Sequence, residues 1–419
     1  MHSYNPGTMR TILLGICIFT NATICAQRDC ASSIYIDQLK SIEPSFATKI
    51  NEQNNSILQQ SRTVSRTSGE GINIIRIPVV VHVLYNTAAQ NISDAQIKSQ
   101  IDALNRDFRK RNADTINTPE RFKNLAADVQ IEFALATADP KGRMTTGITR
   151  RQTNVSEWKL DDKIKFADQG GENSWDSRYY LNFWIGNMRN ILGYSSVPGA
   201  AADKDGIVIN VSAFGTINTN PPFDLGRTAV HEVGHWLGLK HIWGDSYCGD
   251  DQIEDTPLQG NFTPGCPAGF RTSCSNGTMG DMYMNFMDFT NDACLNLFTK
   301  GQKEKMLSLF TTEGSRNSIL SGRGLSEAWT VDSPVTELPV KEFKYYPNPA
   351  NNEIILNFGN NDGWIGKTFS IISINGTILS RNFISSKIQK LNIVSLKAGM
   401  YFIQAENGKE MIRQKFMKL

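Results

Sequence analysis

The middle of the chain alternates short apolar runs with polar loops, a pattern that predicts strands followed by a helix. Segments 181–186 and 205–210 combine β-branched and aromatic residues and are expected to be strands, and a further strand is expected to open at Gly193. The next apolar positions fall at helical spacing up to His235, with Asp224 as the expected N-cap. The pattern therefore predicts a sheet followed by one helix.

The first residues show the pattern of an export signal. Arg10 precedes an apolar run over residues 11–20 that is too short to cross a bilayer, and cleavage is expected near Ala26. Residues 1–26 are therefore expected to be a signal peptide. No later segment is long and apolar enough to span a membrane, so no transmembrane segment is expected after the signal is removed.

The carboxyl end has a third pattern. A stretch at 321–339 that contains Pro334 and Pro339 is expected to be a linker. Beyond it, Asn-Gly turn signals separate short alternating runs and predict two β-hairpins. The four predicted strands are 369–374, 377–379, 400–403 and 411–413. Residues 340–419 are therefore expected to form a small all-β sandwich.

Composition and cysteine count limit the class of protein. The 419 residues carry a net charge of only +2, so nothing indicates a nucleic-acid partner. Of the seven cysteines, two fall in the expected signal peptide and Cys30 stands alone at the start of the exported chain. The remaining four can form two disulfides in an oxidising compartment, and the sequence permits three pairings. These four are Cys248, Cys266, Cys274 and Cys294.

An eleven-residue segment carries the chemistry. His231 and His235 are four residues apart and lie on one face of a helix, so both imidazoles can reach one ion. Gly238 allows the backbone to leave the helix sharply, and His241 can then supply a third nitrogen. Three imidazoles leave a fourth zinc position open, as in catalytic zinc sites. Glu232 stands where a general base is needed.

The alternative is that this segment holds ordinary surface histidines beside a glutamate. The chain has five histidines, and three of them lie in this one segment. The segment also has the full spacing of the metzincin signature, including the glycine and the third histidine. A catalytic zinc site is therefore the better interpretation.

Several separated motifs resemble those of the pappalysin family of secreted metzincin zinc peptidases. The resemblance covers about residues 28–315 and is carried by segments 77–83, 192–194, 231–245, 251–257, 284–288 and 298–302. It implies an α/β catalytic domain at 71–320 with a twisted mixed sheet, a zinc-site helix and a backing helix. The resemblance also implies a cleft between two subdomains, where an edge strand beginning near Gly193 pairs with extended substrate.

The resemblance also implies roles for particular residues. Met287 is expected to be the Met-turn residue beneath the zinc site, and the disulfides are expected to join Cys248 to Cys274 and Cys266 to Cys294. In the family a tyrosine stands two residues after this methionine and its hydroxyl helps to stabilise the tetrahedral intermediate. This chain has Phe289, which has no donor. Reduced but real activity is therefore expected.

The segment 251–256 resembles the calcium-binding loop of the family. Closely spaced oxygen ligands suit calcium, so Asp251, Asp255 and Thr256 are candidate ligands of a structural ion. A solvated acidic turn is the alternative for any one of them.

The start of the exported chain indicates latency. Arg28-Asp29-Cys30 resembles the cysteine switch of the family, in which a thiolate takes the fourth zinc position, although Ala31 stands where the family usually has glycine. A stray thiol is the alternative. Residues 27–70 are therefore expected to be a pro-segment.

The body of that pro-segment is expected to be helical over 31–60 and polar and exposed over 52–69. Arg62 and Arg66 are the expected activation sites. The apolar face of the helical stretch is expected to contain Leu39, Ile42, Phe46 and Ile50.

The carboxyl-terminal residues resemble a sorting domain of the type IX secretion system. The resemblance is carried by Tyr346-Pro347-Asn348-Pro349, by residues 396–401 and by the basic end of the chain. It implies export across a bacterial outer membrane, with the secretion machinery as a partner. A module that binds a surface or a carbohydrate is the alternative.

The leading hypothesis is a secreted zinc-dependent endopeptidase, made as a zymogen, that cleaves polypeptides with a zinc-activated water and Glu232 as base. The alternative is a catalytically weak or inactive zinc-containing protein that binds a surface, such as an adhesin. It would explain Phe289, but the presence of Glu232 argues against it, because holding a zinc ion does not require that carboxylate. A zinc hydrolase with a substrate other than peptide is a third possibility, and the expected edge strand argues against it.

Overall fold

The computed structural model describes residues 30–67, 74–326, 343–359, 362–374, 377–406 and 411–419. The expected signal peptide, residues 1–26, and most of the expected linker lie outside these ranges. The chain divides into an N-terminal unit, residues 1–330, and a C-terminal unit, residues 331–419. The two units are described separately below.

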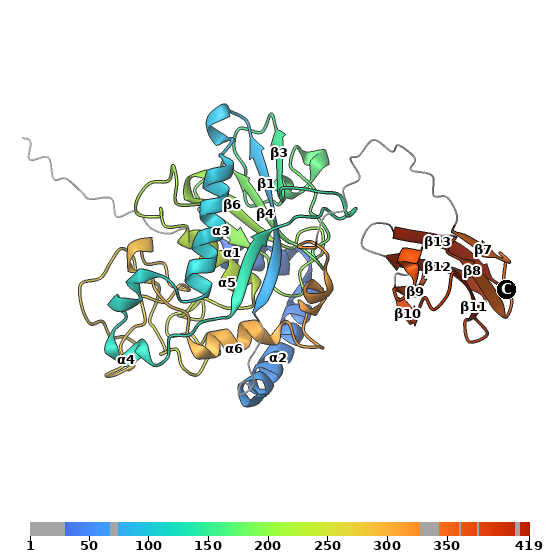
Figure 1. Cartoon of the computed structure of the whole chain (residues 1–419). Helices are drawn as coiled ribbons and strands as arrows, with labels where there is room; N and C mark the ends of the chain where they lie inside the picture. Colours follow the sequence, from blue (N-terminus) through green and yellow to red (C-terminus); the bar gives the residue numbers. More distant parts are fainter. Residues whose placement is uncertain (1–29, 68–73, 327–342, 360–361, 375–376, 407–410) are drawn as a thin grey trace, which may run out of the picture. The chain divides into compact units, whose positions relative to one another are not determined.

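The N-terminal unit is built on a six-stranded sheet of order β2-β1-β4-β6-β5, with β3 also paired to β1 (Figure 1). All pairings are parallel except that of β5 with β6, so the sheet is mixed and β5 is its edge strand. The strands are β1 (Ile75–Tyr85), β2 (Ile131–Leu135), β3 (Ile148–Gln152), β4 (Leu181–Gly186), β5 (Gly193–Ser195) and β6 (Ile207–Asn210). The three strands expected in this region are confirmed.

Side chains of β4 show why the sheet is covered on both faces. Phe183 and Ile185 pack into the main core with α3 and α5, whereas Trp184 points to the other face, where Val208 and Tyr194 lie. This alternation follows from the two-residue period of a strand. The helices are α1 (Ser32–Ile42), α2 (Pro44–Thr67), α3 (Asp94–Phe108), α4 (Glu120–Lys123), α5 (Arg227–Trp236) and α6 (Lys300–Ser308).

The amino-terminal segment, residues 30–67, differs from its expected form. Helix formation breaks at Glu43, which is extended (φ −127°, ψ 92°) because the proline ring of Pro44 disfavours a helical residue before it. Ile42 is 79% exposed and lies off the expected apolar face. α2 then continues to Thr67 and packs against α6. Over residues 52–62 the expected polar run is helical and only partly exposed, with Ile57 fully buried.

The two expected activation sites, Arg62 and Arg66, therefore lie inside α2 rather than in a loop. Ordered structure also extends into the stretch that was expected to be a linker. The carbonyl of Gly324 accepts a hydrogen bond from the backbone N–H of Thr137 at 2.8 Å, and the chain is described through Ser326.

The C-terminal unit consists of two antiparallel sheets around its own apolar core, as the expected β-sandwich requires. The two expected hairpins are confirmed as the pairs β9–β10 and β12–β13, and their turn residues lie outside the described ranges. The strands are β7 (Lys344–Tyr346), β8 (Glu353–Asn357), β9 (Thr368–Ser373), β10 (Ile378–Phe383), β11 (Ile388–Asn392), β12 (Gly399–Glu406) and β13 (Met411–Lys418).

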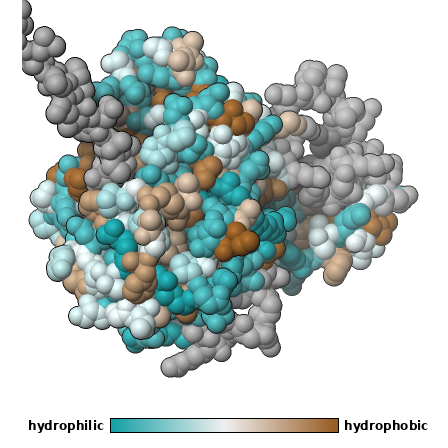
Figure 2. Space-filling view, turned by 90° about the vertical axis from the view of Figure 1, so that its left-hand side faces the viewer, coloured by the Kyte–Doolittle hydropathy of each residue, from teal (hydrophilic) through white to brown (hydrophobic). Residues whose placement is uncertain are grey.

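The face of the molecule in Figure 2 is mostly hydrophilic, with hydrophobic residues scattered over it in small groups. Such scattered apolar residues are ordinary for a protein surface. Among the described residues, none of the helices has the length and apolarity that a membrane span requires.

The N-terminus of α5 is capped from a distant part of the chain, and the expected cap is wrong. Gly226 is the N-cap, with φ 75°, and no side chain caps the helix at that residue. Instead the carboxylate of Asp292 accepts hydrogen bonds from the backbone N–H groups of Leu225 (2.9 Å) and Arg227 (3.2 Å). A carboxylate at this end also complements the helix dipole.

Replacing Asp292 with Ala is expected to lower the free energy of unfolding of the N-terminal unit by about 1–2 kcal/mol, because two backbone donors lose their acceptor. Urea unfolding followed by tryptophan fluorescence measures the change. Asp224→Ala is the matched control and is expected to change stability little. Equal effects of the two substitutions would contradict this account of the cap.

Candidate metal centre

Three imidazoles converge at the end of α5. His231 and His235 share one face of the helix, and Gly238, with φ 82°, turns the chain so that His241 comes back to the same point. The Nε2 atom of His235 lies 3.1 Å from the Nε2 atoms of both other histidines. All three side chains are at least 96% buried. The structure therefore brings together the three histidines expected as ligands.

Each imidazole is held through its other nitrogen. The Nδ1 atom of His231 bonds the carbonyl of Phe286 at 2.7 Å, and that of His235 bonds the carbonyl of Leu239 at 2.9 Å. The Nδ1 atom of His241 bonds the carboxylate of Asp245. With the Nδ1–H groups engaged in this way, the three Nε2 lone pairs point at one another, as in a metal site.

Burial, together with the neighbouring His241, lowers the pKa of His235 to about 3. Its imidazole is therefore neutral at ordinary pH, which is the form that binds a metal.

Cys30 closes the fourth side of this group. Its Sγ atom lies 3.6 Å from Nε2 of His235, and the four candidate ligand atoms lie within 4.8 Å of one another. A tetrahedral zinc would hold two imidazole nitrogens about 3.3 Å apart and a nitrogen and a thiolate about 3.6 Å apart. The residues present therefore fit a zinc ion.

Residues next to Cys30 engage the rest of the cleft. Ala31 donates its N–H to the carbonyl of Gly193 at 3.0 Å, and Cys30 forms a parallel bridge with Gly193 on β5. Ser32 donates to Oε2 of the buried Glu232 at 2.7 Å, while Ser33 donates to Asp245 at 2.6 Å. The amino-terminal segment thus occupies the edge strand where extended substrate is expected.

Met287 lies directly beneath α5, where a Met-turn residue is expected. It is fully buried, and a Cβ atom placed on Gly234 would come within 2.4 Å of its Sδ atom. Glycine in the middle of a helix costs stability, and here it makes room for this contact. Gly234 was not among the residues expected to build the site, although a glycine between the first two histidines is a visible signal in the sequence.

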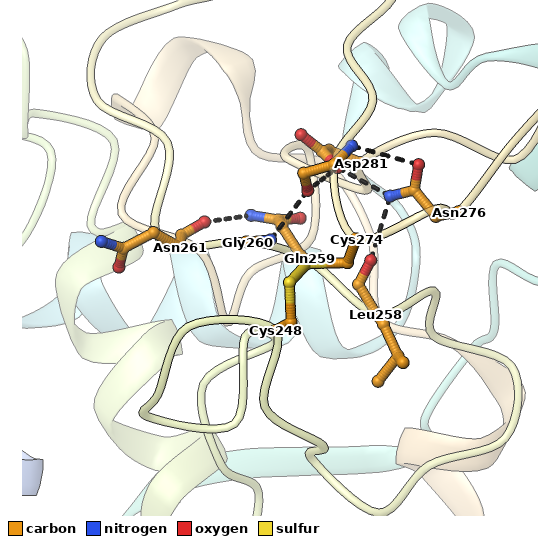
Figure 3. The surroundings of a disulfide bond; sticks show 9 residues. Cys248, Leu258, Gln259, Gly260, Asn261, Cys274, Asn276 and Asp281 are labelled. Carbon is orange, nitrogen blue, oxygen red and sulfur yellow. Dashed lines mark hydrogen bonds between the residues drawn. A yellow bond between two sulfur atoms is a disulfide. The ribbon is translucent and has the colours of Figure 1, made fainter.

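Two disulfides secure the long loops that follow the third histidine. They join Cys248 to Cys274 and Cys266 to Cys294, which is the pairing that the resemblance implied. Figure 3 shows the first of them beside Asp281, whose carboxylate accepts a hydrogen bond from Asn276 at 2.7 Å.

The candidate calcium loop is only partly assembled as expected. The hydroxyl of Thr256 lies 2.8 Å from both Oδ1 of Asp251 and the carbonyl of Ile253. The other oxygen of Asp251 is buried with no hydrogen-bond partner in the described part of the chain, and burial raises the pKa of this carboxyl to about 7. Asp255 instead accepts hydrogen bonds from Thr299 and Gly301 at the start of α6.

Phe289 stands at the rim of the histidine group. It is 8% exposed, its ring centroid lies 4.8 Å from that of His241, and it packs against Trp243. The hydroxyl groups of Tyr194 and Tyr283, which could in principle replace the hydroxyl that Phe289 lacks, are both engaged elsewhere. Tyr194 bonds Asp162 at 3.2 Å, and Tyr283 donates to the carbonyl of Gly269 at 3.0 Å.

Comparison with known proteins agrees with this geometry. A family model described as pregnancy-associated plasma protein-A matches residues 166–311, and one described as a secretion system C-terminal sorting domain matches residues 344–418. An extracellular metalloprotease of Pyricularia oryzae is 33% identical over 249 residues, which cover 56% of this chain and 75% of the relative.

Two solved structures are similar as well. A promirolysin mutant of Tannerella forsythia is 47% identical, with a TM-score of 0.65, and the match covers 70% of this chain and 97% of that one. Mature mirolysin of the same organism, in complex with a cleaved peptide, is 51% identical with a TM-score of 0.59, and the match covers 60% of this chain and 97% of that one.

The mixed sheet, the three histidines and the matches together define a metzincin-type metallopeptidase with a zymogen structure, and this class implies a catalytic zinc. The chain belongs to the pappalysin family, and the relatives it matches are named extracellular metalloproteases. Its carboxyl-terminal match indicates export by the type IX secretion system.

Proposed function

We propose that this chain is a secreted zinc endopeptidase in which His231, His235 and His241 hold the ion and Glu232 is the general base. A zinc ion held by these residues would supply Lewis-acid polarisation of the scissile carbonyl and would acidify the attacking water. Glu232 takes the proton of that water and returns it to the leaving amine. The polypeptide is bound as an additional strand along β5.

The contact between Ser32 and Glu232 carries this proposal. Oε2 of Glu232 accepts a hydrogen bond from the Ser32 hydroxyl at 2.7 Å, on the side of the helix that faces the cleft. In the latent chain the Ser32 hydroxyl therefore donates to Glu232 in the way that the attacking water is proposed to donate in the active enzyme. A scaffold that only held a metal would not need a buried carboxylate there.

Latency in this proposal comes from Cys30, which takes the fourth ligand position and excludes the attacking water. Burial and the nearby Glu232 carboxylate raise the pKa of the Cys30 thiol well above its usual value. The protein alone therefore favours the protonated thiol, and a thiolate here requires a cation among the imidazoles. The pro-segment reinforces the block by covering Glu232 and β5.

A structural calcium ion is proposed at the loop that contains Asp251 and Thr256. The support is the buried Asp251 oxygen that lacks a hydrogen-bond partner in the described part of the chain, because a hard cation would satisfy it. Asp255 stabilises this loop by accepting a hydrogen bond from the backbone N–H of Gly301 in the first turn of α6.

With the pro-segment removed and zinc supplied to every protein compared, Glu232→Gln is expected to lower cleavage of a proteome-derived peptide library by about 10²–10⁴-fold, because the base that accepts the proton of the attacking water is lost. Mass spectrometry of the products measures the change. Glu120→Gln, at an exposed position, is the control and is expected to cleave like the parent. If the Glu232→Gln protein cleaves as fast as the parent, Glu232 is not the general base. If the parent cleaves no peptide above the level of this variant, the surface-binding alternative is favoured.

Cys30→Ser is expected to make the full chain measurably more active than the parent before the pro-segment is removed, because a neutral hydroxyl is a far weaker zinc ligand than a thiolate. The remaining contacts of the segment with Glu232 and β5 keep this activity below that of the processed enzyme. The rate of peptide cleavage before any processing, with chain length followed by electrophoresis, measures this. Ile34→Ala, at a position 59% exposed in the same segment, is expected to stay latent. A Cys30→Ser protein as latent as the parent would rule out the thiol switch.

Phe289→Tyr is expected to raise kcat by about tenfold, because the added hydroxyl donates to the oxyanion of the tetrahedral intermediate. Phe262→Tyr adds the same group elsewhere in the same aromatic cluster and is expected to leave kcat unchanged. Steady-state kinetics of the activated enzymes decide the matter. An unchanged or lower kcat for Phe289→Tyr would show that the missing donor does not limit turnover.

A further inference from the structure

The side chain of Tyr35, five residues after Cys30, lies in a slot beside the edge strand. Tyr35 is 2% exposed although it belongs to the pro-segment. Its ring centroid lies 4.8 Å from that of Tyr194 and 5.0 Å from the ammonium of Lys165. Its hydroxyl donates to Oδ2 of Asp162 at 2.8 Å. We call the three residues Asp162, Lys165 and Tyr194 the tyrosine slot.

The tyrosine slot is built by the catalytic unit and does not depend on the pro-segment for its charges. Lys165 is fully buried and pairs with Asp162 at 2.9 Å, while its ammonium also donates to the carbonyl of Lys204 at 2.8 Å. The hydroxyl of Tyr194 bonds the other carboxylate oxygen of Asp162 at 3.2 Å. A buried ion pair contributes little to stability, so a recognition role accounts for it better.

The slot also lies on the path of the substrate. Tyr194 is the central residue of β5, next to Gly193, which carries the backbone contacts to Cys30 and Ala31. Cys30 and Ala31 lie along β5, and Tyr35 enters the slot from α1, which begins at Ser32. A peptide that pairs with β5 in place of the pro-segment would run along the same strand, whose central side chain, Tyr194, forms one wall of the slot.

We propose that the tyrosine slot is a substrate subsite of the active peptidase, which binds a tyrosine side chain of the polypeptide, and that Tyr35 fills it in the latent chain. This inference rests on the proposed peptidase function. Asp162 accepts the phenolic hydrogen bond, and the Lys165 ammonium favours an aromatic face. A lysine or arginine side chain in the slot would be repelled by the Lys165 ammonium, and a carboxylate would be repelled by Asp162.

The test is a position scan with the activated, zinc-loaded enzyme. Peptides carry Tyr, Phe or Ala in turn at each of the positions on both sides of one scissile bond, and kcat/KM is measured for each peptide. At one position, Tyr is expected to exceed Phe by about tenfold, the value of a hydrogen bond to a charged acceptor, and Phe to exceed Ala.

Asp162→Asn is expected to bring the ratio of Tyr to Phe at that position close to one, with its folding checked by the thermal midpoint. Asp161→Asn removes the same charge from the exposed neighbouring residue and is expected to keep the ratio of the parent. If Asp162→Asn does not fold, the ratio measured with the parent enzyme alone decides between the outcomes.

Cleavage of the Ala peptides without a preference for Tyr over Phe at any position would overturn the subsite and leave the peptidase function standing. A preference for Tyr that survives Asp162→Asn would also overturn the assignment to this slot. Cleavage of no peptide above the level of Glu232→Gln would instead overturn the proposed function, and the subsite with it.

Discussion

The convergence of three imidazole lone pairs is the constraint on which the rest of the N-terminal unit depends. Nitrogen atoms 3.1 Å apart that all point inwards are unfavourable without a cation, and the fold holds them there through the Nδ1 bonds to Phe286, Leu239 and Asp245. Leu239 lies in the turn that ends α5, where its N–H bonds the carbonyl of Gly234, and Phe286 precedes Met287, which packs against Gly234. Metal binding and folding of this region are therefore coupled.

The amino-terminal segment uses the same cleft as an intramolecular ligand. Its contacts with Gly193, Glu232 and the tyrosine slot fall within six residues, from Cys30 to Tyr35. α2 adds a different kind of attachment, because Ile57 enters the main core and approaches Gly238. Removal of the segment therefore uncovers both apolar surface and the polar groups of the site. Because α2 is helical and packs against α6, a protease can cleave within it only after the helix opens locally.

The sequence was sufficient where a single local pattern decides the structure. β4 and α5 follow from alternation and from the spacing of the histidines, and the break before Pro44 could have been read from the proline itself. It was insufficient where a distant residue decides. The carboxylate that caps α5 comes from Asp292, 65 residues beyond Arg227, and no local signal distinguishes it from Asp224. The partners of Tyr35 were equally hidden, because a buried lysine resembles an exposed one in sequence.

The aromatic wall around His241 offers a physical reason for a site that lacks the usual tyrosine. The ring of Trp243 stacks on His241 with centroids 4.4 Å apart, and Phe289 closes the edge with Phe262 behind it. These rings carry few polar atoms, so they lower the local dielectric and strengthen the interaction of every charge that remains. A hydroxyl at position 289 would add a donor but would also make the surroundings of His241 less apolar. The balance between a drier site and an additional donor therefore sets how much of the catalysis falls on the metal and the glutamate.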